Sequence, residues 1–178
     1  MIIATPKDSI EAGNILYTAT ITERPFAIRY SRDKIKYVKK QTYKKIQIGS
    51  WEMIEKGKDS ILITYGYLLE NAKIIREDLK EKIDLGIVNA RFQKPIDKTM
   101  FEDILDNYKN IYVYEEATYI NSLGSYLVNY ANTYGYKGKI NIFAIPDEFV
   151  LQGKKSEVLK RLELDPESIE KKIIKKTK

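Results

Sequence analysis

The stretch SILITYGYLLENAKIIREDLKEKIDLGIVNA, residues 60–90, decides the fold. Apolar runs at residues 60–66 and 85–90 have the length and composition of buried strands. Between these runs an apolar residue recurs at helical spacing, which predicts a helix over residues 68–82 with one buried face formed by Leu68, Ala72, Ile75 and Leu79. A strand, a helix and a second strand in this order are typical of a parallel sheet with crossover helices.

The same alternation continues toward the end of the chain. Further strands are expected in NIYVYEE (110–116) and KINIFAI (139–145), and further helices at residues 98–108 and 122–132, from near Lys154, and from Pro166 with Asp165 as cap. The stretch IQIGSWEMIEKG (46–57) alternates like a strand and, with turn residues near Gly57, is expected to form a hairpin with residues 60–66. The prediction is a three-layer α/β/α domain over residues 46–178, with a mostly parallel five-stranded sheet whose first strand is antiparallel.

Residues 1–32 predict a partial βαβ unit in front of this domain. MIIA and FAIRY are short apolar strands, and the helix between them is expected to start with Thr5 as N-cap and Pro6 as its first residue. Its buried face is expected to contain Ala12, Ile15, Leu16 and Ala19. One βαβ unit cannot cover both faces of its strands, so we interpret it as the remnant of a larger sheet. We expect it to pack on a second copy of the chain or to fold back on residues 46–178, with the lysine-rich residues 33–45 as the linker.

Composition excludes several kinds of site. The 178 residues include no cysteine and no histidine, which excludes disulfides, thiolate metal sites and histidine acid–base chemistry. No apolar run approaches the length of a membrane span, and we expect a cytoplasmic protein with no membrane contact. The net charge of +6 comes mainly from the linker and from the tail KKIIKKTK, so we expect solvated lysines and no nucleic-acid partner.

Two arginines near the end of the second strand are the candidate anion-binding residues. Arg29 and Arg32 lie in the stretch RPFAIRYSRDK, residues 24–34. A guanidinium can hold a phosphate or a carboxylate through two charge-assisted hydrogen bonds. Side chains alternate along an extended strand, so the two arginines can share an anion only if the strand ends between them. For Arg29, a structural ion pair is the alternative interpretation.

Other polar groups near strand ends have structural interpretations. Glu115 and Glu116 are neighbours on a strand and point apart, so we expect capping or interface pairing and no catalytic pair. NSLGS (121–125) lacks the glycine spacing of a phosphate loop and predicts a tight helix entry. For Arg91 and Asp97 we expect an interdomain ion pair and helix capping, and for the tyrosines of YVYEEATY a place in the core or an interface.

Several stretches, in order and over almost the whole chain, resemble the C-terminal end of the 1-deoxy-D-xylulose-5-phosphate synthase family in the transketolase group. They are TPKDSIEAGNILYTA, FAIRYSR, IGSWEMIEKGKDSILITYG, NARFQKPID, VYEEATYINSLGS, AIPDEFVLQG and LELDPESIEKKI. The resemblance implies the tail of the pyrimidine-binding domain followed by a complete transketolase C-terminal domain. It also implies that Arg32 contacts the substrate phosphate. Where the family usually reads Tyr-Pro-Arg-Gly, this chain has Tyr30, Ser31, Arg32 and Asp33.

The resemblance further implies a homodimeric enzyme that uses thiamine diphosphate and Mg²⁺. In the family both are held by a Gly-Asp-Gly motif in upstream domains, with a glutamate and histidines also upstream. None of these lies in this chain, so we expect no cofactor or metal to be bound by it. The implied reaction joins pyruvate to glyceraldehyde 3-phosphate, giving 1-deoxy-D-xylulose 5-phosphate for isoprenoid, thiamine and pyridoxal biosynthesis. The expected partners are a second copy and the missing N-terminal domains, and the isolated chain is expected to be inactive and to serve in subunit assembly.

Two alternatives remain open. One is the C-terminal domain of another enzyme of the group, either a transketolase or the beta subunit of an oxo-acid dehydrogenase. The other is a stand-alone α/β assembly module.

Overall fold

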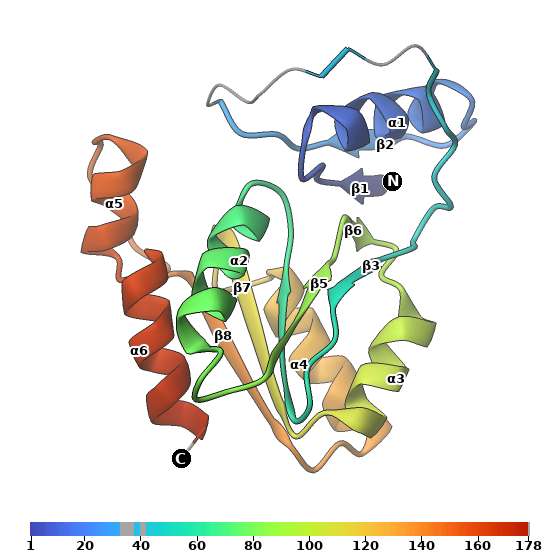
Figure 1. The fold of residues 1–178 in the computed structure, drawn as a ribbon. Coiled ribbons are helices and arrows are strands. Elements are labelled where there is room, and N and C mark those ends of the chain that lie inside the picture. Colours follow the sequence, from blue (N-terminus) through green and yellow to red (C-terminus); the bar gives the residue numbers. More distant parts are fainter. Residues whose placement is uncertain (33–37, 40–41, 178) are drawn as a thin grey trace.

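The structure is a computed structural model that describes residues 1–32, 38–39 and 42–177. It contains two sheets, one above the other (Figure 1). The predicted linker, residues 33–45, falls largely outside the described residues. In the larger sheet the strand order is β3-β5-β4-β7-β8, and in the smaller one it is β2-β1-β6.

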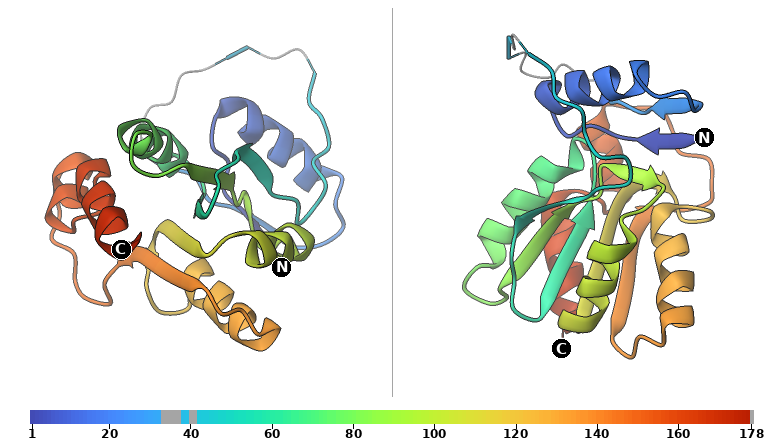
Figure 2. Two further views of the ribbon diagram at one scale, coloured as in Figure 1. Left: turned by 60° about the horizontal axis from the view of Figure 1, so that its bottom comes forward. Right: turned by 90° about the vertical axis from the view of Figure 1, so that its right-hand side faces the viewer.

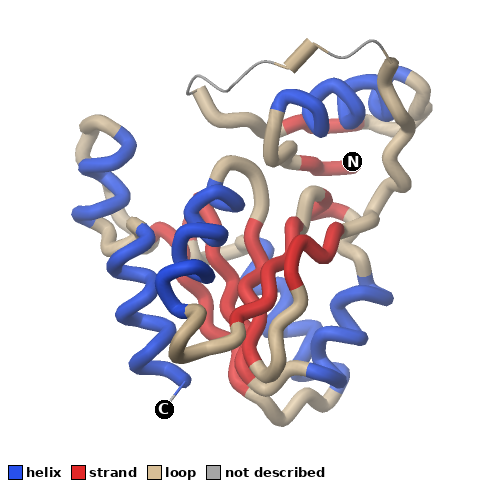
Figure 3. Tube along the Cα trace, viewed as in Figure 1, coloured by secondary structure: helices blue, strands red, loops and turns tan. Residues whose placement is uncertain are grey.

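The larger sheet confirms the predicted fold class. Its strands are β3 (Glu52–Glu55), β4 (Ser60–Thr64), β5 (Leu85–Asn89), β7 (Asn110–Thr118) and β8 (Lys139–Ile145). All neighbouring pairs are parallel except β3 with β5, which is antiparallel. The helices are α2 (Leu68–Leu79), α3 (Lys98–Asn107), α4 (Leu123–Tyr134), α5 (Lys155–Arg161) and α6 (Pro166–Thr177). Figure 3 shows these helices surrounding the red strands.

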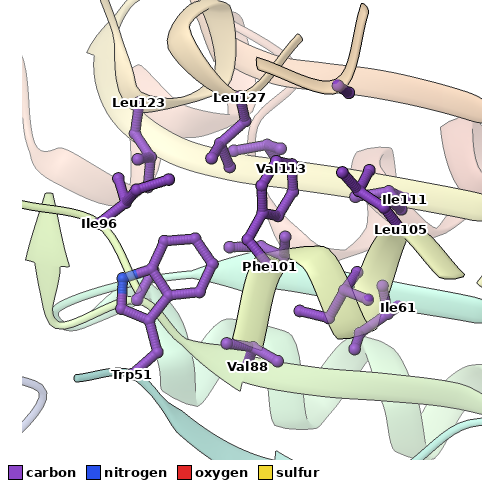
Figure 4. Close-up of a cluster of buried hydrophobic side chains, with 14 of the residues drawn as sticks. Trp51, Ile61, Val88, Ile96, Phe101, Leu105, Ile111, Val113, Leu123 and Leu127 are labelled. Carbon is purple, nitrogen blue, oxygen red and sulfur yellow. The ribbon is translucent and has the colours of Figure 1, made fainter. Parts of the chain in front are cut away.

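Side chains alternate between the two faces of the central strands, so the core is divided between two layers of helices. Figure 2 shows these layers from two further directions. Ile61 and Ile63 of β4 face α3 and α4, while Leu62 faces α2 and α6. Figure 4 shows the first of these clusters, where Phe101 of α3 packs beside Trp51 with ring centroids 6.1 Å apart. The predicted buried face of α2 is confirmed, because its four apolar residues are at most 1% exposed. These strands are buried on both faces, as expected for parallel strands covered by helices.

The predicted hairpin between residues 46–57 and 60–66 is wrong. β3 covers only Glu52–Glu55 and pairs with β5 instead of β4. Both edges of β4 are already occupied by the parallel strands β5 and β7, because each crossover helix returns the chain beside β4. The outer edge of β5 is therefore the place left for β3.

The βαβ unit is present, but its helix starts later than expected. β1 (Ile2–Ala4) and β2 (Phe26–Ile28) are parallel, and α1 (Ser9–Thr20) lies between them in sequence. The N-cap of α1 is Asp8, whose carboxylate accepts a 2.7 Å hydrogen bond from the Glu11 amide. The prediction of Thr5 as cap is wrong, because the Thr5 amide donates to the Arg91 carbonyl at 2.9 Å and joins a different segment.

The predicted buried face of α1 is also wrong in part. Ile15 is buried, but Leu16 is 58% exposed. The buried positions are Glu11, Ile15 and Thr18, which recur at helical spacing. Two of the three are polar and have partners outside the helix. Glu11 contacts the side chains of Asn89 and Arg91. The Thr18 hydroxyl accepts a hydrogen bond from the Ile46 amide at 2.9 Å. Polar partners, and not hydrophobicity alone, therefore set the rotation of α1.

The βαβ unit folds back on the rest of its own chain, which is one of the two expected arrangements. β6 (Phe92–Lys94), which directly follows β5, pairs with β1 in antiparallel orientation. Phe92 lies fully buried with Ile2, Ala4 and Ile15 and makes an edge-on ring contact with Phe26 at 6.3 Å. The small sheet thus combines β1 and β2 of the βαβ unit with β6 from the rest of the chain.

A charged network lies at the same junction. The Glu11 carboxylate, 5% exposed, is 3.4 Å from Arg91 and 3.1 Å from the Asn89 amide nitrogen. Glu52 of β3 contacts Lys7 and lies 3.8 Å from Arg91. Burial raises the pKa of Glu52, but hydrogen bonds from Lys7 and Asn89 and the charges of Lys7 and Arg91 outweigh it and lower the pKa below its usual value. The ion pair predicted for Arg91 is present, and it joins the segment after β5 to α1.

Replacing Glu11 should loosen this junction. Glu11→Ala removes the buried carboxylate that Arg91 and Asn89 share and should lower the free energy of unfolding by about 3 kcal/mol. Urea unfolding measures this loss, and amide exchange in β1 should accelerate with it. Glu23→Ala, an exposed glutamate after α1, is the matched control and should change stability by less than about 0.5 kcal/mol. Equal stability of the two variants would show that the network does not hold the βαβ unit in place.

Candidate functional site

The candidate site lies where the βαβ unit meets the carboxyl ends of the larger sheet. Figure 1 shows the βαβ unit above one end of the larger sheet. Residues that directly follow β1, β2 and β4, together with Glu116 near the end of β7, line one cavity there. In open α/β sheets, ligands bind outside the carboxyl ends of the strands. Among the cavities at this junction, two share residues of the loop after β2.

The first, called the interdomain cavity, has a volume of about 380 Å³. The βαβ unit contributes Lys7 and Arg29 to its wall, and the larger domain contributes Tyr65 and Glu116. The Arg29 guanidinium lies 5.9 Å from the centre of the Tyr65 ring and 3.4 Å from the Glu116 carbonyl oxygen. Burial, followed by the nearby charge of Glu115, raises the pKa of Tyr65, so its hydroxyl remains a donor.

The second, called the α5 cavity, has a volume of about 480 Å³. Arg32 lines it from the loop after β2, and Lys155 lines it from α5. The Lys155 ammonium lies 3.4 Å from the Ser31 hydroxyl oxygen and 2.9 Å from the centre of the Tyr67 ring. The lysine therefore links α5 to both the loop and the start of α2.

The structure places the two candidate arginines in different cavities. β2 ends at Ile28, before both of them, so strand alternation does not fix their directions. Arg29 lines the interdomain cavity and Arg32 the α5 cavity, while Tyr30 and Ser31 line both. Lys7, Tyr65 and Lys155 also line these cavities. No sequence motif indicated a role for them there, because each cavity combines segments that are distant along the chain.

The two adjacent glutamates separate as predicted. Glu116 is exposed, whereas Glu115 is fully buried and caps α4. The Glu115 carboxylate accepts hydrogen bonds from the Leu123 amide at 3.2 Å, from the Gly124 amide at 2.9 Å and from the Tyr65 hydroxyl at 3.1 Å. It is a structural acceptor for the first turn of α4.

The remaining polar candidates are structural as well. In the predicted helix entry NSLGS, Ser122 is the N-cap of α4 and accepts from the Ser125 amide at 3.2 Å. Asp97 caps α3 by accepting from the Met100 amide at 3.0 Å, and it also accepts from the Trp51 amide at 2.8 Å. Tyr112 and Tyr114 lie in the core, while Tyr119 is 52% exposed.

The described residues offer no fit for a divalent metal. They contain no group of three or more acidic, histidine or cysteine side chains placed to bind one. We therefore assign no metal ligand among these residues and derive no chemical step through thiamine diphosphate. Within the same described residues, no helix has the length and apolar character that a membrane span requires.

The capping role of Glu115 gives a paired test with its neighbour. Glu115→Ala removes the acceptor of three buried donors and should lower the free energy of unfolding by roughly 3 kcal/mol or more. Glu115→Gln keeps one acceptor oxygen and should lose less. Glu116→Ala, one residue further along the same strand, should stay within about 0.5 kcal/mol of the parent chain. Thermal and urea unfolding rank the three variants, and a ranking with Glu116→Ala least stable would contradict the assignment.

Comparisons with known proteins agree with this architecture. Two curated 1-deoxy-D-xylulose-5-phosphate synthases are similar to the chain: that of Aquifex aeolicus, 34% identical over 96% of the chain, and that of Clostridium tetani, 37% identical over 98%. The chain covers 27% and 28% of them, about a quarter of their length. These matches confirm the resemblance noted from the sequence.

Two solved structures share the fold. The structure described as split gene transketolase, inactive beta4 tetramer, has a TM-score of 0.84 at 21% identity and covers 98% of this chain and 56% of its own. A transketolase mutant from Pichia stipitis has a TM-score of 0.67 at 16% identity, with 98% and 25% covered. The family model described as transketolase, C-terminal domain, matches residues 49–169. Because that model covers most of the chain, the protein belongs to the transketolase C-terminal domain family.

Proposed function

We propose that this chain is the C-terminal part of a 1-deoxy-D-xylulose-5-phosphate synthase. The observation that carries the proposal is the similarity to curated synthases over 96–98% of the chain, including the βαβ unit that lies outside the family model. The whole enzyme would condense pyruvate with glyceraldehyde 3-phosphate, releasing CO₂. Thiamine diphosphate and Mg²⁺, held elsewhere in the enzyme, would supply the carbanion chemistry. A cytoplasmic location fits the cysteine-free sequence.

Within that enzyme, this chain supplies a wall of the site and a surface for assembly. Arg32 is exposed at the end of the βαβ unit and lines a cavity, which suits contact with the phosphate of the acceptor substrate. Arg29 lies between Tyr65 and the Glu116 carbonyl group and lines the neighbouring cavity, as a second candidate for the same ligand class. The proposed partners are a second copy of the enzyme and its N-terminal domains.

A second candidate function is that of a separate subunit in a split enzyme of the same group. The specific observation in its favour is the similarity of fold to the split gene transketolase structure, which extends over 98% of this chain. In that case the chain would associate with copies of itself and with a subunit encoded separately. The length of the open reading frame that contains this sequence separates the two candidates.

The isolated chain should form no 1-deoxy-D-xylulose 5-phosphate. Its sequence has no histidine and no Gly-Asp-Gly motif, so the groups expected to hold the cofactor and to transfer protons are absent. Product is measured after incubation with both substrates, thiamine diphosphate and Mg²⁺. Turnover above the background of a heat-treated sample would overturn the proposal that catalysis needs other domains.

In the full-length enzyme, Arg32→Ala should impair the use of glyceraldehyde 3-phosphate far more than that of pyruvate. Loss of a charged partner of a phosphate costs roughly 2–4 kcal/mol in a partly buried site, so KM for the phosphorylated substrate should rise at least about thirtyfold. Arg24→Ala, an exposed arginine just before β2, is the matched control and should leave both KM values unchanged. Unchanged KM values in Arg32→Ala would assign Arg32 a structural role.

A further inference from the structure

An apolar surface lies where β7 and β8 end. Tyr119 and Ile120 directly follow β7, and each is about half exposed. In the loop that follows β8, Phe149 is fully exposed, and the exposed Val150 and Leu151 come directly after it. These five residues are termed the strand-end apolar surface.

The two loops that carry this surface leave the same end of the larger sheet. β7 and β8 are parallel neighbours, and the Tyr119 amide donates a 2.8 Å hydrogen bond to the carbonyl of Ile145, the last residue of β8. Phe149 is four residues beyond Ile145, which an extended chain spans in at most about 14 Å. The apolar side chains of both loops therefore belong to one region of the molecular surface.

The loop after β8 has a defined conformation. The Glu148 amide donates a 2.8 Å hydrogen bond to the Pro146 carbonyl, and Arg161 of α5 donates to the Leu151 carbonyl. The other four phenylalanines of the chain are buried or half-buried. Phe149 is thus held in solvent by an ordered backbone, and a cluster of exposed apolar residues of this kind is typical of a protein contact.

The size and charge of the surface fit the centre of an interface between domains. Its two aromatic side chains can together bury roughly 300–500 Å². Interfaces between domains of one chain bury about 600–1,500 Å², so the surface can supply the apolar centre of such an interface. The exposed Asp147 and Glu148 directly precede Phe149, and the complementary surface is therefore expected to carry basic residues beside its apolar contact.

The occupant that the observations favour is the upstream part of the synthase. Curated synthases match 96–98% of this chain, but the chain covers only 27–28% of their length, so most of such an enzyme lies outside it. Both loops also lie beside the βαβ unit, because Asn121 lines one cavity with Ile3 and Gly153 lines another with Tyr30. Upstream residues that extend the small sheet of the βαβ unit would therefore reach this side of the molecule.

We propose that the strand-end apolar surface docks the upstream part of the synthase, which contacts it through an apolar patch with basic residues at its edge. The inference rests on the proposed function and identifies the surface of this chain that makes the assembly contact. Phe149 is the central side chain of the contact, because it is the most exposed residue of the surface and has no polar group.

Hydroxyl-radical footprinting, read by mass spectrometry, tests the contact by comparing the 178-residue chain with the full-length enzyme. Phe149 and Leu151 should be oxidised at least about tenfold more slowly in the full-length enzyme, since side chains at the centre of an interface are shielded from solvent. Tyr119 should be protected as well. Tyr134 is its matched reference, because it is also about half exposed but is the last residue of α4, and its rate should not change. Equal oxidation of Phe149 in the two proteins would overturn the proposal.

A pair of variants tests the central role of Phe149. Phe149→Asp should leave the thermal midpoint of the 178-residue chain unchanged, because the side chain is fully exposed there. In the full-length enzyme the same change should raise the oxidation of Tyr119 and Leu151 to the rates seen in the 178-residue chain. Phe149→Leu keeps an apolar side chain and should leave both protected. Protection that persists in Phe149→Asp would contradict the assignment.

The remaining outcomes identify the occupant and separate this inference from the proposed function. If Phe149 becomes protected in the 178-residue chain as its concentration rises, and light scattering shows dimers, a second copy covers the surface and the inference is wrong. If the full-length enzyme makes 1-deoxy-D-xylulose 5-phosphate while Phe149 stays unprotected, the inference fails and the function stands. If Phe149 is protected but the full-length protein forms no such product, the docking surface stands and the function fails.

Discussion

The antiparallel pairing of β1 with β6 is the contact on which the arrangement of this molecule depends. Through it, the three residues of β6, which follows β5 after two intervening residues, leave the larger sheet and become part of the smaller one. A βαβ unit alone has too little apolar surface for a stable core. By contributing Phe92, the larger domain completes a core of four fully buried residues around Ile2 and Ile15. The same pairing determines the position of the βαβ unit relative to the carboxyl ends of the strands in the larger sheet.

Polar groups determine how the unit is oriented once it is paired. Glu11 is buried, and a buried carboxylate is tolerated only with charged and hydrogen-bonded partners. Arg91 and Asn89 are available because they lie at the end of β5 and directly after it, next to the start of β6. α1 is therefore oriented so that Glu11 contacts Arg91 and Asn89, and this orientation leaves Leu16 exposed. Apolar burial supplies much of the stability of the junction, and this polar contact selects one orientation from several.

The candidate site follows from this geometry. The loop after β2 crosses the carboxyl ends of the larger sheet and separates two cavities, with Arg29 facing one and Arg32 the other. The N-terminus of α4 is already occupied by Glu115 and Ser122, so it offers few free amides to an anion. Arg29 and Arg32 therefore stay the candidate anion-binding residues at this edge.

The sequence by itself determined the five-stranded α/β domain, because each strand and helix there carries a periodicity set by residues close in the chain, such as Leu68, Ala72, Ile75 and Leu79 of α2. It also identified Asp97, Asp165 and Ser122 as caps or helix entries, since capping is local. Only the tertiary structure decided the partner of β3, the rotation of α1 and the meeting of Lys155 with Ser31. Each of these three features depends on the strand edges, charged groups and cavities that distant segments of the chain leave available. A local sequence pattern carries no information about those segments.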